Sequence, residues 1–167
     1  MLNQKFNTAR VDRRLVLGKN AALVRTLPSG AEQSINFDTE VVTATNVITA
    51  AENGRTFFLN SATEFVSTLP APQAGLRFTF VVSAAPSGAS YTIVTNGSAN
   101  IIVGHVVSSD LNAASDGDSE TSGGDTISFV DGKAVKGDTV ELLCDGTNWY
   151  ARAFCVAFDA ITITTAS

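Results

Sequence analysis

The chain has 167 residues, of which 44% are hydrophobic and 16% are charged, and its formal net charge is −5. These values are typical of one globular domain that can bury a core of its own, and they exclude a disordered chain. No apolar run approaches the roughly 18 residues of a membrane-spanning helix, and the first residues lack the apolar region of a secretory signal, so we expect neither.

The charge is divided unevenly along the chain, and residues 1–26 hold the positive part. This segment has six basic residues against one acid, which gives +5 and leaves −10 for the remainder. The six are Lys5, Arg10, Arg13, Arg14, Lys19 and Arg25. A positive segment on an acidic body favours docking onto an acidic protein surface, so we predict that these side chains bind a partner protein. We do not expect nucleic acid as the partner, because the body would repel it.

Residues 1–45 are predicted to form an arm, and residues 46–167 to form the domain. The arm has strand-like pieces at Leu15–Leu17, Ala21–Thr26 and Ser34–Phe37 but few paired hydrophobic residues. We therefore expect it to be extended, or to form a small sheet that another subunit covers. The compact part begins with Val47–Leu59.

The rest of the chain alternates apolar and polar residues with a period of two, which predicts half-buried β-strands. The alternating segments lie around residues 77–82, 91–95, 126–130, 139–144 and 161–164. Turn signals such as Asn53-Gly54, Pro86-Ser87-Gly88 and Asp131-Gly132 separate them at intervals of roughly ten residues. We predict an all-β fold, an antiparallel sandwich or jelly-roll-like domain. The predicted core comprises Phe57, Leu59, Phe78, Phe80, Ile93, Ile127, Phe129, Val140, Leu142 and one of Trp149 and Tyr150.

Residues 108–125 interrupt this pattern with five acids and three glycines, which predicts a surface loop with at most one helical turn at 110–118. Asp116, Asp118, Glu120 and Asp125 could offer oxygen ligands to Ca²⁺, but the order of an EF-hand is missing. A solvated loop without metal is therefore the preferred interpretation.

The residue types that usually carry chemistry are sparse. His105, the only histidine, lies in an apolar run without an acid or nucleophile in a motif, so we interpret it as structural. Cys144 and Cys155 would lie about 20 Å apart if residues 145–148 form a hairpin turn, beyond the reach of a disulfide, so both are predicted to be buried free thiols. We expect no enzymatic activity and no cofactor.

Two stretches resemble virion proteins of tailed bacteriophages. They are residues 69–82 (LPAPQAGLRFTFVV) and residues 137–150 (GDTVELLCDGTNWY). The pattern is similar to the β-modules of phage capsid decoration (cement) proteins and of tail fibres, over roughly residues 55–155. The resemblance implies no catalytic residues. It implies instead a virion protein that contacts its neighbours, and extended termini are common in cement proteins.

The sequence and the resemblance together predict a capsid decoration protein on the exterior of a phage head. It would bind the major capsid protein, form a homo-oligomer, expected to be a trimer, and have no membrane partner. The alternative is a tail-associated module that binds a receptor or glycan. An exposed Trp149–Tyr150 pair would favour that alternative, although two successive strand residues face opposite sides, so one should be buried.

Overall fold

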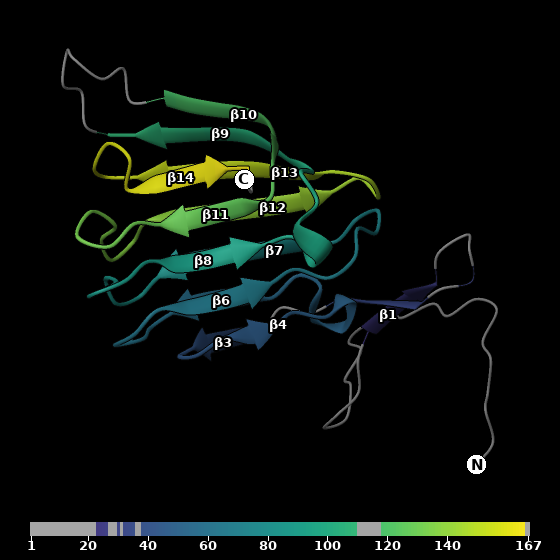
Figure 1. Ribbon diagram of the computed structural model, residues 1–167. Helices are drawn as coiled ribbons and strands as arrows, with labels where there is room; N and C mark the ends of the chain where they lie inside the picture. The colour runs from purple at the N-terminus through teal and green to yellow at the C-terminus, as the bar shows by residue number, and fades with distance from the viewer. Residues whose placement is uncertain (1–22, 27–29, 31, 36–37, 110–117, 166–167) are drawn as a thin grey trace.

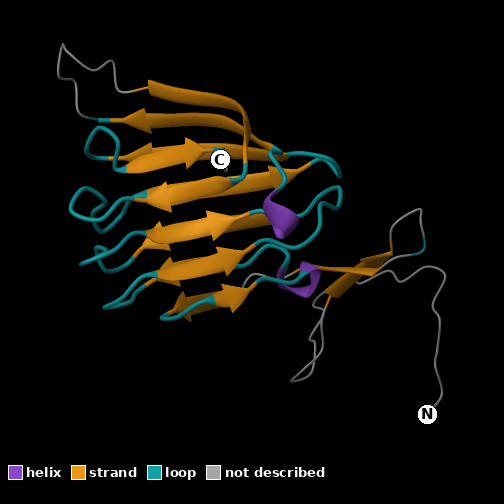
Figure 2. Cartoon of the chain, in the orientation of Figure 1, coloured by secondary structure: helices purple, strands orange, loops and turns teal. Residues whose placement is uncertain are grey.

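In the computed structural model, the described residues are 23–26, 30, 32–35, 38–109 and 118–165. They form two sheets packed face to face and a separate two-stranded sheet of β1 (Leu23–Thr26) and β2 (Glu32–Ile35), as Figure 1 and Figure 2 show. In spatial order the seven-stranded sheet contains β10 (Asp118–Gly124), β9 (Ile102–Ser108), β13 (Trp149–Cys155), β12 (Thr139–Cys144), β7 (Arg77–Val82), β5 (Thr56–Leu59) and β3 (Thr39–Val42). The five-stranded sheet contains β14 (Ile161–Thr164), β11 (Thr126–Phe129), β8 (Tyr91–Val94), β6 (Phe65–Thr68) and β4 (Asn46–Val47). Two single turns of 3₁₀-helix, η1 (Ala50–Glu52) and η2 (Asn96–Ser98), complete the described structure.

The predicted all-β sandwich is confirmed, but its sheets are mixed rather than antiparallel throughout. From β3 to β8 the chain places successive strands alternately in the two sheets, so each strand pairs in parallel with the strand two places along: β3 with β5, β5 with β7, β4 with β6 and β6 with β8. The strands that follow pair mainly in antiparallel fashion, apart from the parallel pair β9–β13. Side chains alternate with a period of two in both parallel and antiparallel sheets. The sequence therefore does not reveal that the chain passes back and forth between the two sheets from β3 to β8.

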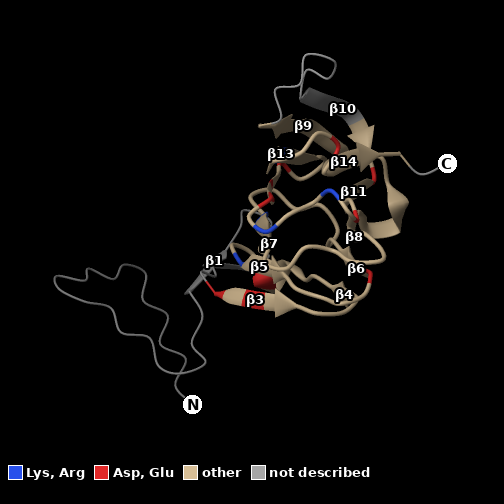
Figure 3. Ribbon diagram, turned by 90° about the vertical axis from the view of Figure 1, so that its left-hand side faces the viewer, with Lys and Arg blue, Asp and Glu red and all other residues tan. Residues whose placement is uncertain are grey.

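Side chains from the two sheets meet in one aromatic core. The nine core residues predicted without an alternative are at most 2% exposed, and Trp149 rather than Tyr150 is the buried member of its pair. Phe57 and Phe80 stack with ring centroids 5.2 Å apart in one sheet, and Phe65 and Tyr91 stack at 4.5 Å in the other. Figure 3 views the two layers from the side. Burial of this many aromatic rings is the main source of stability.

The sandwich begins earlier than the sequence predicts. Strand β3 lies before the predicted boundary at residue 45, yet it pairs with β5, and Val42 is 3% exposed in the core. Strands β1 and β2 pair with each other, Leu23 opposite Ile35, and with neither large sheet.

Part of the predicted surface loop 108–125 is a strand. Strand β10 pairs in antiparallel fashion with β9, and Asp125, which follows it, is only 2% exposed. An edge strand needs backbone hydrogen bonds rather than alternating apolar residues, so its polar composition did not signal a strand. Residues 110–117, including Asp116 and most of the possible helical turn, lie outside the described residues.

Candidate binding face

The two sequence motifs lie side by side in the structure. Strands β7 and β12 pair in antiparallel register, with Phe78 opposite Leu142 and Phe80 opposite Val140. The N–H of Gly75 donates to the carbonyl of Cys144, and the N–H of Cys144 donates to the carbonyl of Leu76, both at 2.8 Å. Gly75 has a φ of +86°, a conformation that glycine adopts without strain. The motifs therefore build one continuous surface although about 60 residues separate them.

The turn between β12 and β13 is held by the Asp145 side chain. One carboxylate oxygen accepts the N–H groups of Thr147 and Asn148, each at 2.7 Å, and the other accepts the Tyr150 hydroxyl at 3.0 Å. The two backbone donors hold the pKa of Asp145 below its ordinary value, and the hydrogen bond to this carboxylate raises the pKa of the Tyr150 hydroxyl. This turn confirms the hairpin predicted at residues 145–148.

Asp138 has a similar role at the other end of the same strands. Its side chain is 1% exposed, and its two oxygens accept the N–H of Val135 at 2.9 Å and the N–H of Val156 at 3.0 Å. It therefore ties the loop before β12 to the end of β13. The second motif thus places one aspartate at each end of the β12–β13 pair.

The seven-stranded sheet turns its outer face away from the five-stranded sheet, and we refer to this solvent-facing side as the outer face. The strand registers align its side chains in three rows. The apolar row contains Val41, Phe58, Val81, Thr139, Phe154 and Val107. The middle row contains Thr39, Thr56, Thr79, Glu141, Arg152 and His105. The third row contains Arg77, Leu143, Tyr150 and Val103.

The apolar row is unusual for a sheet face that the described residues leave uncovered. Phe154 and Val41 are each 56% exposed, and Val107 is 41% exposed. The row crosses six neighbouring strands, and its members lie about 4.8 Å apart from strand to strand, so they form a stripe rather than scattered residues. Contiguous exposed apolar surface of this kind typically marks an interaction site.

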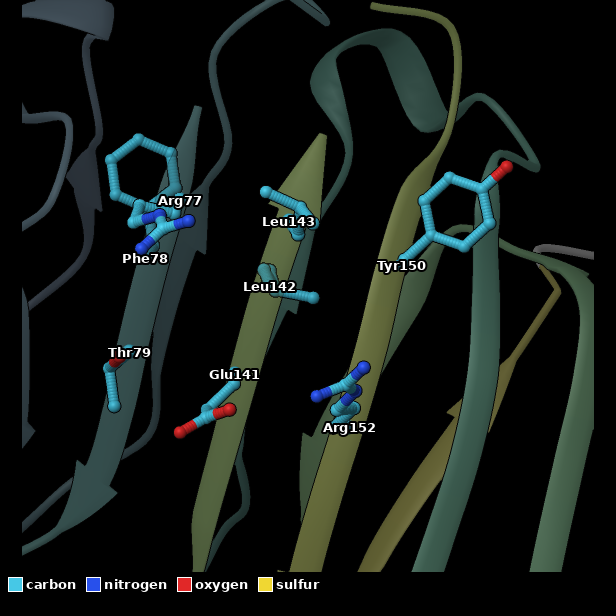
Figure 4. Close-up of a pocket in the computed structure, with 8 residues that line it drawn as sticks. All are labelled: Arg77, Phe78, Thr79, Glu141, Leu142, Leu143, Tyr150 and Arg152. Atoms are coloured by element: carbon cyan, nitrogen blue, oxygen red, sulfur yellow. The ribbon is translucent and has the colours of Figure 1, made fainter. Parts of the chain in front are cut away.

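A shallow depression lies beside the stripe, over β7, β12 and β13 (Figure 4). Its volume is about 340 Å³, and it is lined by Arg77, Phe78, Thr79, Glu141, Leu142, Leu143, Tyr150 and Arg152. All of these except Arg152 belong to the two sequence motifs. Among the described residues, the side chains of Arg77, Glu141 and Arg152 form no ion pair within 4 Å.

The structure places only one of the six predicted arm residues. Arg25 lies in β1, with its Cα opposite that of Gln33. Lys5, Arg10, Arg13, Arg14 and Lys19 lie outside the described residues, so their predicted role stays a prediction. The sequence alone did not predict the outer face. Its only signal in the sequence is three large apolar or aromatic residues, Leu143, Tyr150 and Phe154, at strand positions that alternate with the buried ones.

The remaining candidates from the sequence are placed as follows. His105 is exposed in the middle row, with its Cα opposite that of Arg152. Cys144 and Cys155 are buried free thiols, as predicted, and burial raises the pKa of each. Within the described part of the chain, no group of three or more His, Cys, Asp or Glu side chains is arranged to hold a metal ion.

Comparison with protein-family models, curated proteins and solved structures gives no match to this chain. Of the helices in the described ranges, none has the length and apolar character needed to span a membrane.

Proposed function

We propose that this chain is a structural virion protein that decorates the exterior of a phage head. The observation that carries the proposal is the exposed apolar stripe across the outer face, because such a surface suits a protein that works inside an assembly. The two motifs that resemble cement proteins pair strand to strand and form the depression beside that stripe.

Residues 1–26 supply the contact with the major capsid protein in this proposal. Their charge of +5 contrasts with −10 for the remainder, which gives the chain a basic end that can dock on an acidic capsid surface. The protein would act by cohesion: binding to the assembled shell stabilises that shell by mass action. It would require neither a catalytic group nor a cofactor.

The test is cosedimentation of the purified protein with phage heads that lack it. Deleting residues 1–26 should leave a folded sandwich that no longer sediments with heads, and Arg13→Glu with Arg14→Glu should weaken binding. Added salt should weaken wild-type binding as well, since exposed charges are screened beyond about 8 Å at physiological ionic strength.

Lys133→Glu with Lys136→Glu is the matched control, because it makes the same change in net charge on exposed residues of the sandwich. It should bind like the wild type. Full binding by the truncated chain would contradict the role of the arm. Equal rupture temperatures for heads with and without the protein would contradict the decoration function.

A tail-associated glycan-binding module is the second candidate, and the depression beside Tyr150 favours it. Tyr150 is 43% exposed and lies beside Arg152, so its ring could stack on a sugar whose acidic groups meet the arginine. Trp149 is fully buried, which leaves Tyr150 as the exposed member of the expected pair. A glycan array would identify this function if binding is lost in Tyr150→Ala, and particles lacking the chain would then fail to attach to cells while their heads stay intact.

A further inference from the structure

The outer face carries a pattern of charge that fits a copy of itself. Glu141 on β12 and Arg152 on β13 occupy directly opposite positions in the middle row. In Figure 4 the Glu141 carboxylate turns toward Thr79, away from Arg152. An acid and a base therefore stand side by side on an open surface, and among the described residues neither has an ion-pair partner.

We propose that a second copy of this chain covers the outer face, related to the first by a two-fold axis that runs parallel to the strands between β12 and β13. Rotation about this axis places β12 of one copy opposite β13 of the other. Each row of one copy then lies opposite the same row of the other. Glu141 of each copy then faces Arg152 of the other, which gives two reciprocal ion pairs. A two-fold interface brings the same surface of both copies together, so that surface must complement itself. The two reciprocal Glu141–Arg152 pairs meet this requirement.

The same axis also matches the apolar residues. Phe154 faces Thr139 of the other copy, and Val81 on β7 faces Val107 on β9. In the third row Leu143 faces the ring of Tyr150. The part of the stripe that lies on β7, β12, β13 and β9 is thereby buried against itself, whereas Phe58 on β5 lies opposite β10 and Val41 on β3 lies beyond the edge of the other copy. The buried part supplies the apolar contact, while the ion pairs fix the orientation.

The other two-fold arrangement is unfavourable. An axis in the plane of the face but perpendicular to the strands would place β13 against itself. If that axis passed through the middle row, Arg152 would face Arg152, and if it lay between the middle and apolar rows, the charged row would cover the apolar stripe. An axis along the apolar row would bury the stripe against itself but would not bring Glu141 opposite Arg152. Among these arrangements, the axis parallel to the strands is the one that pairs the opposite charges.

The size of the face indicates a modest affinity. The four strands that face each other, β7, β12, β13 and β9, lie about 4.8 Å apart and carry three rows, so they span a patch of roughly 350 Å² on each copy. Two such patches bury roughly 700 Å², the size of a weak, transient interface, so we expect a dissociation constant on the order of 100 µM. This inference does not depend on capsid binding, because it concerns the purified protein alone.

The experiment measures association of the purified full-length chain by sedimentation velocity at concentrations up to about 200 µM. The wild type should form dimers. Glu141→Arg and Arg152→Glu should each weaken association at least about tenfold, because each places like charges opposite one another at both symmetry-related positions.

Mixing these two variants is the decisive step. One copy then presents two arginines and the other presents two glutamates, so both intermolecular pairs are restored while the like charges within each chain remain. The mixture should associate although neither variant does so alone. The double variant Glu141→Arg with Arg152→Glu should also recover association.

The apolar stripe has its own test and control. Phe154→Ser should weaken association, whereas Val47→Ser, at a position 69% exposed in the five-stranded sheet, should not change it. Circular dichroism confirms that each variant is folded. A wild-type chain that stays monomeric, or a mixture that fails to associate, would overturn the proposal. Trimers that are insensitive to all of these changes would overturn it as well and would assign oligomerisation to other surfaces.

Discussion

Replacing Asp138 tests whether the second motif acts as a structural clamp. The side chain is buried and accepts two backbone N–H groups, from Val135 and from Val156. Asp138→Ala removes both acceptors and leaves both donors without a protein partner. The loop before β12 should then detach from the end of β13.

The size of the effect follows from the two bonds. A hydrogen bond to a charged group contributes about 1.5–3 kcal/mol, so two could contribute about 3–6 kcal/mol. Both hydrogen bonds lie at part-buried positions, so water can reach the freed N–H groups in part and reduce the loss. We therefore expect the free energy of unfolding to fall by about 2–3 kcal/mol. Asp138→Asn should be nearly as harmful, because its amide nitrogen would face a second donor.

Urea titration at low protein concentration measures this loss through the shift in midpoint at an unchanged slope. Asp131→Ala is the matched control, because Asp131 also accepts a backbone N–H across a loop, from Gly88 at 3.1 Å, but at an exposed site. It should cost about 0.5 kcal/mol. If Asp138→Ala costs no more than this control, the clamp contributes nothing and our reasoning is wrong.

Three further predictions concern packing and pH. Gly104→Ala should unfold the protein or sharply lower its melting temperature, since a Cβ would lie 2.1 Å from the carbonyl oxygen of Ala151; a melting temperature within a few degrees of the wild type would contradict this close approach. Phe80→Ala should cost about 3–5 kcal/mol in urea titration, because the ring is fully buried; a loss below about 1 kcal/mol would mean that the inner face of β7 is misplaced. Asp145, whose pKa is lowered in the folded state, should contribute stability that is present above its ordinary value of 3.8 and is lost as the pH falls through the lower folded value. The difference in stability between the wild type and Asp145→Asn should therefore shrink as the pH falls below 3.8, and a constant difference would mean that Asp145 does not titrate in this way.

The sequence by itself determined several of the strands and which side of them faces inward. Phe78, Phe80 and Val82 alternate with Arg77 and Thr79, and a strand is the arrangement that puts both rings and the branched valine on one side. The turn at Asp145-Gly146 was equally readable, because its residue types have a local conformational preference that does not depend on distant contacts. The prediction that Cys144 and Cys155 lie too far apart for a disulfide followed from that turn.

Only the tertiary structure decided how the strands are shared between sheets and what the outer face looks like. Alternation has the same period in parallel and antiparallel sheets, so the passage of the chain between the two sheets from β3 to β8 leaves no local signal in the sequence. Strand β10 was missed because an edge strand is held by its backbone. The stripe that includes Phe154, Val81 and Val41 joins residues far apart in the chain, and only the pairing registers bring them into one row. The outer face exists because registers, which are set by the packing of the whole sandwich, place those residues side by side.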